Sequence, residues 1–122
     1  MSKDFTAITQ AILQFRDERN WQQFHTIKDL LLGLQMETAE LAELVLWKSE
    51  AEISQTSQLQ KPEIAAEIAD IFIFLTYISQ HFEVDLLAAV EHKLQLNALK
   101  YPIAKSWNCN KKYTEFKDED AS

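Results

Sequence analysis

Two pairs of carboxylates, each spaced one helical turn apart, are the residues of this chain best suited to do chemistry. Glu37 and Glu40 form the first pair, and Glu67 and Asp70 form the second. A separation of three residues places both members of a pair on the same side of an α-helix. Both pairs lie in strongly apolar stretches. If the two helices run antiparallel, all four carboxylates converge on one small volume at the edge of a buried face.

Converging carboxylates repel one another and lose hydration, so such a cluster requires a cation. Mg²⁺ is the natural candidate, with Mn²⁺ as its substitute, because it is hard, prefers oxygen ligands and is completed by waters and substrate phosphates. In phosphoryl transfer, metal ions shield the phosphate charge and lower the pKa of the attacking water, whose proton a carboxylate accepts. The pattern therefore predicts a Mg²⁺-dependent hydrolase of nucleotide phosphates.

Other uses of the acids fit the sequence less well. A carboxylate on a helix surface commonly has a cation four residues later, but the residue at that position is apolar for all four acids. A di-iron carboxylate bundle requires Glu-x-x-His on two helices, and none of the three histidines stands three residues after a glutamate. No motif of a serine or cysteine nucleophile occurs either.

Composition limits both the fold and the ligand. The chain has 122 residues, one glycine, two prolines and 47% hydrophobic residues, which favours a single all-α domain over residues 1–122. Its net charge is −7, with 12 basic and 19 acidic residues. This balance argues against a nucleic-acid polymer as partner, because a phosphate backbone binds clustered Lys and Arg. A small polyanion remains compatible when metal ions and a few lysines offset the repulsion.

Four segments have the 3.6-residue apolar period of an α-helix. We predict helices over residues 5–20, 27–49, 62–82 and 86–101. The N-terminal caps are Ser2 or Asp4 for the first helix, Thr26 for the second and Asp85 for the fourth, and Pro62 suits the first turn of the third. The polar segment 50–61 is predicted to be a loop. The fold expected is a four-helix antiparallel bundle-like domain, with a tail over residues 103–122 that either folds over the site or trails in solvent.

The second predicted helix is apolar nearly all round. Leu32, Met36 and Leu46 lie on the side opposite its main apolar stripe. A helix of this kind is central to its domain or shared with another subunit. In a chain this small we therefore expect a homo-oligomer, in which a second copy completes the bundle.

The lone cysteine and the short apolar runs bear on location. Cys109 cannot form an internal disulfide, and no zinc-binding spacing includes it. The longest strongly apolar run, Ile71–Leu75, is far shorter than a membrane span, and Met1–Thr6 contains no apolar region. We expect a cytoplasmic protein with no membrane partner.

Aromatic and basic side chains suggest how a ligand is recognised. Trp21 and His25 lie in the connection after the first helix, where they either plug the end of the bundle or stack on a ligand. Along the third helix the carboxylates are followed by Phe74 and Tyr77, an order that suits a ligand with a polyphosphate at one end and a flat ring at the other.

The fourth helix carries one polar side. Lys93, Asn97 and Lys100 recur on it at helical spacing. They form a solvated face, or face phosphates if this helix packs beside the acids.

Five stretches match a known family: residues 15–25, 37–48, 67–70, 97–102 and 112–115. The chain resembles the all-α nucleoside triphosphate pyrophosphohydrolases of the MazG type, and most closely their dCTP pyrophosphatase branch. The paired acids are typical of the superfamily, whereas the segments Trp21–His25 and Trp47–Lys48 indicate the dCTP branch.

The resemblance implies hydrolysis between the α- and β-phosphates of a dNTP, dCTP or a modified dCTP, in sanitation of the nucleotide pool. It implies Mg²⁺ held by the four acids, which are Glu37, Glu40, Glu67 and Asp70. It also implies base contacts by Trp21, His25 and Trp47, and phosphate or sugar contacts by Lys93, Asn97, Lys100 and Tyr101. The implied assembly is a dimer or tetramer with sites at subunit interfaces.

One departure from the family concerns the base. Phe74 stands where the mammalian dCTP enzymes carry a tyrosine, so the ring is kept and a hydroxyl contact is lost. Reaction type is therefore better defined than base preference. The competing hypothesis is a non-catalytic helical module that uses the same faces to bind a nucleotide or a protein partner.

Overall fold

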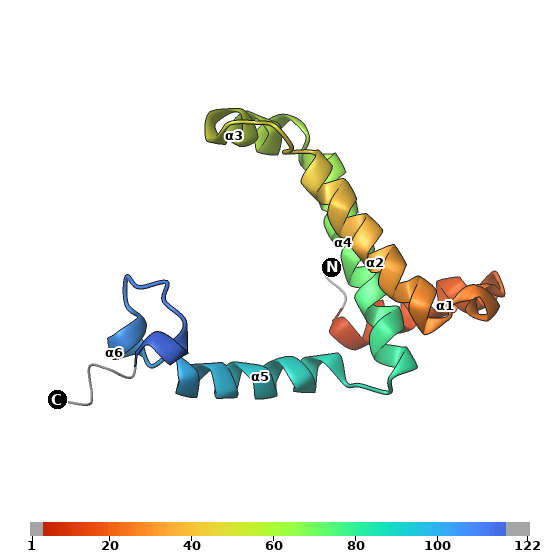
Figure 1. The fold of residues 1–122 in the computed structure, drawn as a ribbon. Coiled ribbons are helices and arrows are strands. Elements are labelled where there is room, and N and C mark those ends of the chain that lie inside the picture. The colour runs from red at the N-terminus through yellow and green to blue at the C-terminus, as the bar shows by residue number, and fades with distance from the viewer. Residues whose placement is uncertain (1–3, 117–122) are drawn as a thin grey trace. The chain divides into compact units, whose positions relative to one another are not determined.

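A computed structural model describes residues 4–116, and the regular elements among them are all α-helices or 3₁₀ turns (Figure 1). The predicted all-α class is confirmed. The chain divides into two compact units, residues 1–84 and residues 85–122, and each is described by itself. The single domain, the four-helix bundle and its completion by a second copy stay predictions.

The helices of the first unit begin at local capping signals. In α1 (Phe5–Glu18) the Asp4 carboxylate accepts a hydrogen bond of 2.7 Å from the Ala7 backbone N–H, so the predicted cap is confirmed. Ser2, the alternative cap, lies outside the described residues. After the 3₁₀ turn η1 (Trp21–Phe24), the Thr26 hydroxyl accepts from the backbone N–H of Asp29 and starts α2 (Ile27–Glu43). Side-chain acceptors of this type satisfy N–H groups that a helix leaves unpaired.

Helices α2 and α4 (Lys61–His81) form the main packed pair of the unit, and Figure 1 shows them side by side. They run antiparallel, because Gly33 on α2 meets Phe74 on α4 while Glu37, one turn later on α2, meets Asp70, one turn earlier on α4. Pro62 occupies the first turn of α4, as predicted. This antiparallel packing is the condition under which the two acid pairs converge.

Two predictions about the segment between α2 and α4 were wrong. Helix α2 ends at Glu43 rather than near Ser49, because the chain tightens into turns and Trp47 takes a left-handed φ of 63° that an α-helix cannot continue. Residues 50–61 are not a loop: α3 spans Glu50–Leu59. Ser49 and Glu52 form a reciprocal capping box at its start, which stabilises a helix despite weak apolar periodicity.

The second unit contains α5 (Leu86–Lys100), α6 (Ile103–Ser106) and the 3₁₀ turn η2 (Tyr113–Glu115). Asp85 caps α5 by accepting from the Ala88 backbone N–H at 3.1 Å, as predicted. The Tyr101 ring meets those of Tyr113 and Phe116 edge to face, with each pair of centroids 6.0 Å apart. The start of the predicted tail thus folds onto the end of α5, whereas residues 117–122 lie outside the described part of the chain.

Within residues 4–116, no helix taken singly has both the length and the apolar character needed to cross a membrane. Helices α4 and α5, which follow one another in the sequence, meet those two criteria only when they are counted together.

Candidate functional site

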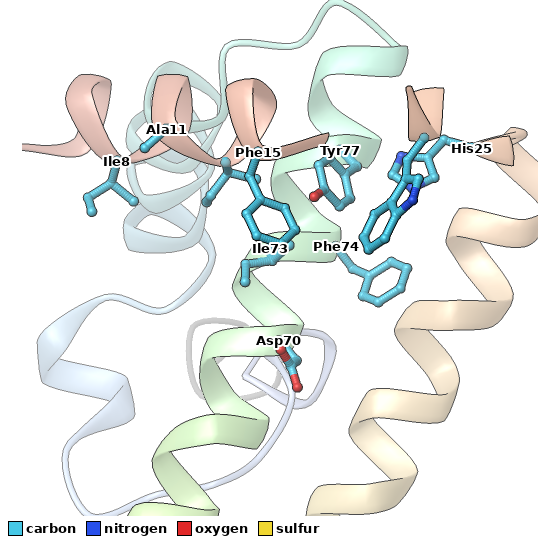
Figure 2. Close-up of a pocket in the computed structure, with 10 residues that line it drawn as sticks. Ile8, Ala11, Phe15, His25, Asp70, Ile73, Phe74 and Tyr77 are labelled. Atoms are coloured by element: carbon cyan, nitrogen blue, oxygen red, sulfur yellow. The ribbon is translucent and has the colours of Figure 1, made fainter. Parts of the chain in front are cut away.

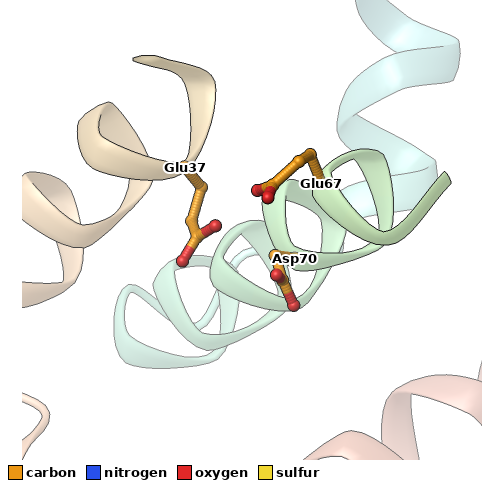
Figure 3. Close-up of side chains that lie close together, drawn as sticks. All are labelled: Glu37, Glu67 and Asp70. Carbon is orange, nitrogen blue, oxygen red and sulfur yellow. The ribbon is translucent and has the colours of Figure 1, made fainter. Parts of the chain in front are cut away.

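Carboxylates of Glu37, Glu67 and Asp70 meet between α2 and α4 (Figure 3). One oxygen from each residue lies within 4.8 Å of the corresponding oxygens of the other two. The Oε2 atoms of Glu37 and Glu67 are shielded from solvent, and neither has a hydrogen-bond partner among the described residues. The antiparallel pair of helices therefore brings together acids that are thirty residues apart in the sequence.

The electrostatics of the cluster are those of carboxylates that lack a counter-ion. Burial raises the pKa of Glu37 to about 7, with further contributions from Glu40 and Asp70 and from the adjacent carboxyl of Glu67. Burial also raises the pKa of Glu67, as do Glu40 and Asp70, while the neighbouring Glu37 acts in the opposite direction. The Glu40 charge thus acts on both Glu37 and Glu67. In the described part of the chain, no ion pair includes any of these four acids.

This arrangement fits a hard divalent cation. It offers several carboxylate oxygens in one small volume, and two of those oxygens are shielded yet unpartnered. Mg²⁺ and Mn²⁺ take such ligands and keep positions open for water and phosphate. Glu37, Glu67 and Asp70 would supply the ligand atoms, and Glu40 lies beside them.

The raised pKa of Glu37 predicts that metal binding is linked to pH. Its pKa is about 7 in the folded chain against 4.5 for an unperturbed glutamate. Between those values the folded, metal-free protein binds more protons than the unfolded chain, so its stability falls as pH rises from about 4.5 to about 7. Metal requires ionised ligands, so Mg²⁺ binding should release protons below pH 7 and tighten as pH rises to about 7.

Titration calorimetry at about pH 6.5, in two buffers of different ionisation enthalpy, measures this release. Glu37→Gln removes the titrating carboxyl and should reduce the number of protons released. An Mg²⁺ affinity that does not change between about pH 5.5 and 7.5 would contradict the prediction.

A cavity of about 470 Å³ opens beside the acid cluster. Aromatic and aliphatic side chains from α1, η1 and α4 line it, as Figure 2 shows. Asp70 lines it as well and also belongs to the acid cluster. The acid cluster and the cavity therefore adjoin at Asp70, which belongs to both.

Tyr77 is the centre of the ring contacts in this cavity. Its buried ring lies 4.6 Å from that of His25, centroid to centroid, and meets Phe74 edge to face at 6.2 Å. Burial, followed by the Arg16 charge, lowers the pKa of His25, and its Nδ1 is shielded without a hydrogen-bond partner among residues 4–116. The neutral imidazole thus keeps an unused polar atom beside the cavity.

The buried guanidinium of Arg16 packs against one of these rings, that of Tyr77. Arg16 is 5% exposed, and its Nε donates to the Asp17 carboxylate at 2.8 Å. Its Nη1 donates to the Gln80 side-chain oxygen at 3.1 Å, which ties α1 to α4. The guanidinium carbon lies 5.9 Å from the centroid of the Tyr77 ring, a cation–π distance. Arg16 therefore packs against the same Tyr77 ring that His25 contacts.

The structure brings together some of the predicted site residues. Trp21, His25, Phe74 and Asp70 line the cavity. Four others, Lys93, Asn97, Lys100 and Tyr101, belong to the second unit, on α5 or just after it. Lys100 there lies over the Tyr113 ring at 5.0 Å. Their contacts with phosphate or sugar stay predictions.

Trp47 does not line the cavity. Its side chain is 92% exposed, beyond the C-terminus of α2, whereas the cavity borders η1, which precedes the N-terminus of that helix. Helix α2 has 17 residues and is therefore about 25 Å long. Trp47 therefore lies away from this cavity within the single chain, and its contact with the base stays a prediction.

Six residues that line the cavity were absent from the predicted site: Ile8, Ala11, Ile12, Phe15, Ile73 and Tyr77. The sequence had already placed Tyr77 with Phe74 on one side of the third predicted helix, because it follows Asp70 and Phe74 at spacings of seven and three. It was not assigned to the site. Phe15 comes from α1, and its position depends on how that helix packs across α4, which local sequence does not specify.

Known proteins share both the sequence and the fold. The chain is 36% identical to dCTP pyrophosphatase 1 of Homo sapiens over 104 residues, which cover 84% of this chain and 61% of that protein. It is 39% identical to dCTP pyrophosphatase 1 of Rattus norvegicus over the same shares. The chain thus spans about three fifths of the length of these curated relatives.

A solved structure extends the comparison. A pyrophosphatase from Archaeoglobus fulgidus DSM 4304 is similar with a TM-score of 0.76 and 32% sequence identity, covering 84% of this chain and 95% of that one. The profile of the MazG-like family matches residues 33–116, which include both acid pairs and most of the chain. The chain therefore belongs to the MazG-like family.

Proposed function

We propose that this protein is a Mg²⁺-dependent nucleoside triphosphate pyrophosphohydrolase that converts dCTP or a modified dCTP to the monophosphate and pyrophosphate. The observation that carries the proposal is Asp70, which belongs both to the acid cluster and to the aromatic cavity. A nucleotide has the same polarity, with a polyphosphate at one end and a flat base at the other. The activities for which the relatives are named, dCTP pyrophosphatase and pyrophosphatase, support the same reaction.

The residues of the chain divide the chemistry between them. Bound Mg²⁺ would shield the phosphate charge and make the attacking water more acidic. Glu37, Glu67 and Asp70 hold the ionised oxygens for it, and Glu40 beside them is available to accept the proton of the water. Attack at the α-phosphorus breaks its bond to the bridging oxygen, and pyrophosphate leaves with that oxygen. The nucleoside monophosphate gains the hydroxyl.

Product analysis tests the reaction. Purified protein is incubated with a panel of dNTPs and Mg²⁺ or Mn²⁺, and the products are separated by ion exchange. Monophosphate and pyrophosphate in equal amounts are expected, and they should be absent when EDTA is present. Diphosphate with inorganic phosphate would reject the proposed cleavage site. No turnover across the panel would favour a non-catalytic helical module that binds a nucleotide or a protein.

We assign base recognition to the cavity, in which His25 offers a polar atom to the base and Trp21 a ring on which the base stacks. A stacked base contributes about 1 to 3 kcal/mol, so His25→Ala should raise KM about five- to 150-fold with a small change in the melting temperature. Steady-state kinetics and thermal melts measure the two effects. A variant that unfolds while its folded fraction keeps a normal KM would instead show that the ring only plugs the end of the bundle.

Assembly is proposed to be a homo-oligomer, a dimer or tetramer. The side chains of Leu32, Met36 and Leu46 on α2 or just after it are 49%, 64% and 53% exposed in the single chain, and leaving such groups in water costs up to about 1.5 to 3 kcal/mol each. We further propose that Trp47, held outward, contacts the base in the cavity of a second copy. Sedimentation at low micromolar concentration should show a dimer or larger, and a stable monomer would reject this assembly.

We expect the protein to act on the nucleotide pool of the cytoplasm, since a free thiol at Cys109 suits a reducing compartment.

A further inference from the structure

Gly33 is the only glycine of the chain, and it lies within α2 rather than in a turn. Its φ is not positive, so the backbone does not require glycine there. Glycine weakens a helix interior relative to alanine. The role of this glycine therefore lies in a tertiary contact.

That contact is with the Phe74 ring. A Cβ atom placed on Gly33 would lie 2.6 Å from Cζ and 3.2 Å from Cδ1 of Phe74, and closer still to Cε1. Carbon atoms in contact prefer about 3.5 to 4.0 Å. Figure 2 shows the ring pointing away from α4, and it lies against the bare backbone of α2.

The same ring forms part of the cavity wall. Phe74 lines the cavity and meets the Tyr77 ring edge to face. Gly33 lies one turn before Glu37 on α2, and Phe74 lies one turn after Asp70 on α4. The contact between Gly33 and Phe74 thus lies one helical turn from the acid cluster. Because the α2 backbone blocks one side of the ring, a side chain at position 33 would displace the ring toward the cavity.

We infer that Gly33 is a specificity-determining residue: its missing side chain lets the Phe74 ring withdraw against α2 and sets the size of base that the cavity accepts. This inference rests on the proposed function, since it takes the cavity as the base site. Phe74 contacts the base, whereas Gly33 acts through Phe74 and positions it.

A size-graded set of substrates tests the inference. The substrates dCTP, 5-methyl-dCTP and 5-iodo-dCTP share their sugar and phosphates and differ only at one ring position. Gly33→Ala should lose at least about tenfold more kcat/KM with 5-iodo-dCTP than with dCTP, mainly through KM, as added ring volume in a tight apolar pocket does. The double variant with Phe74→Leu should lose this dependence on size, because the obstructing ring is gone.

Thermal melts test the contact without reference to activity. They compare the wild type, Gly33→Ala, Phe74→Leu and the double variant. In the Phe74→Leu background, Gly33→Ala should raise the melting temperature, because alanine is the better helix former. In the Phe74 background, Gly33→Ala should raise the melting temperature less, or lower it, because the new methyl group meets the ring. The difference between the two backgrounds is the coupling between the residues.

The outcomes separate this inference from the proposed function. Equal melting shifts in both backgrounds, or a loss of kcat/KM that is the same for all three substrates, would overturn the role of Gly33 alone. A wild-type protein that hydrolyses no dNTP would overturn the proposed function and, with it, the assignment of the cavity to a base.

Discussion

Replacing Glu67 by glutamine should lower kcat/KM for the proposed reaction by about a hundredfold or more. Loss of a group that only supports a metal ligand already costs about 10- to 100-fold, and Glu67 offers an oxygen to the cluster itself. Glutamine keeps the shape and removes the charge. The metal-free variant should melt at or above the temperature of the wild type, since one of the repelling carboxylates is gone.

Melts with EDTA and with Mg²⁺ complete the measurement. Stabilisation by a ligand grows with its occupancy, so the rise on adding Mg²⁺ should be large in the wild type and small in Glu67→Gln. Glu63→Gln is the matched control, because Glu63 is exposed one turn earlier on α4 and does not belong to the cluster. A metal-free variant that is strongly destabilised, with no Mg²⁺ response in the wild type, would show a structural charge network instead of a metal site.

Truncating Tyr77 to alanine should produce the largest loss of stability of any single change in the cavity. The ring is 6% exposed and contacts His25 and Phe74. Removing a buried aromatic ring costs about 3 to 5 kcal/mol. The folded fraction should also bind nucleotide weakly, because His25 and Phe74 lose the ring that holds them in place. Urea denaturation measures the free energy of unfolding, and kinetics at low temperature measure KM.

Tyr77→Phe separates the ring from its hydroxyl. It keeps the packing and should cost less than about 1.5 kcal/mol, the range of one hydrogen bond. If Tyr77→Phe were as damaging as Tyr77→Ala, the hydroxyl rather than the ring would be the important group. If Tyr77→Ala left stability unchanged, the ring contacts described above would not stabilise the first unit.

Local signals in the sequence determined where most helices begin and which acids share a side. Asp4, Thr26 and Asp85 cap their helices through hydrogen bonds that span three residues, so a short window of sequence contains the information. The same holds for the acid pairs, because a spacing of three fixes their common side once the segment is helical. The all-α class followed from periodicity summed over long segments.

Helix α3 shows where apolar periodicity failed as a guide. Its faces are weakly apolar, so the polar segment was predicted to be a loop. The Ser49-x-x-Glu52 capping box was present in the sequence and was the better signal. The early end of α2 had no comparable signal, because the left-handed φ of Trp47 occurs in a residue type that rarely adopts it.

Only the tertiary structure decided what surrounds the acids. Arg16 reaches Gln80 across 64 residues, and the cavity combines side chains from α1, η1 and α4. Such contacts depend on the angle at which one helix crosses another, which is set by packing rather than by propensity. For the same reason the closeness of Gly33 to Phe74 appeared only in the fold. The sequence by itself determined the chemistry available to this protein, and the packing of α1 and α2 on α4 decided the shape of the cavity beside it.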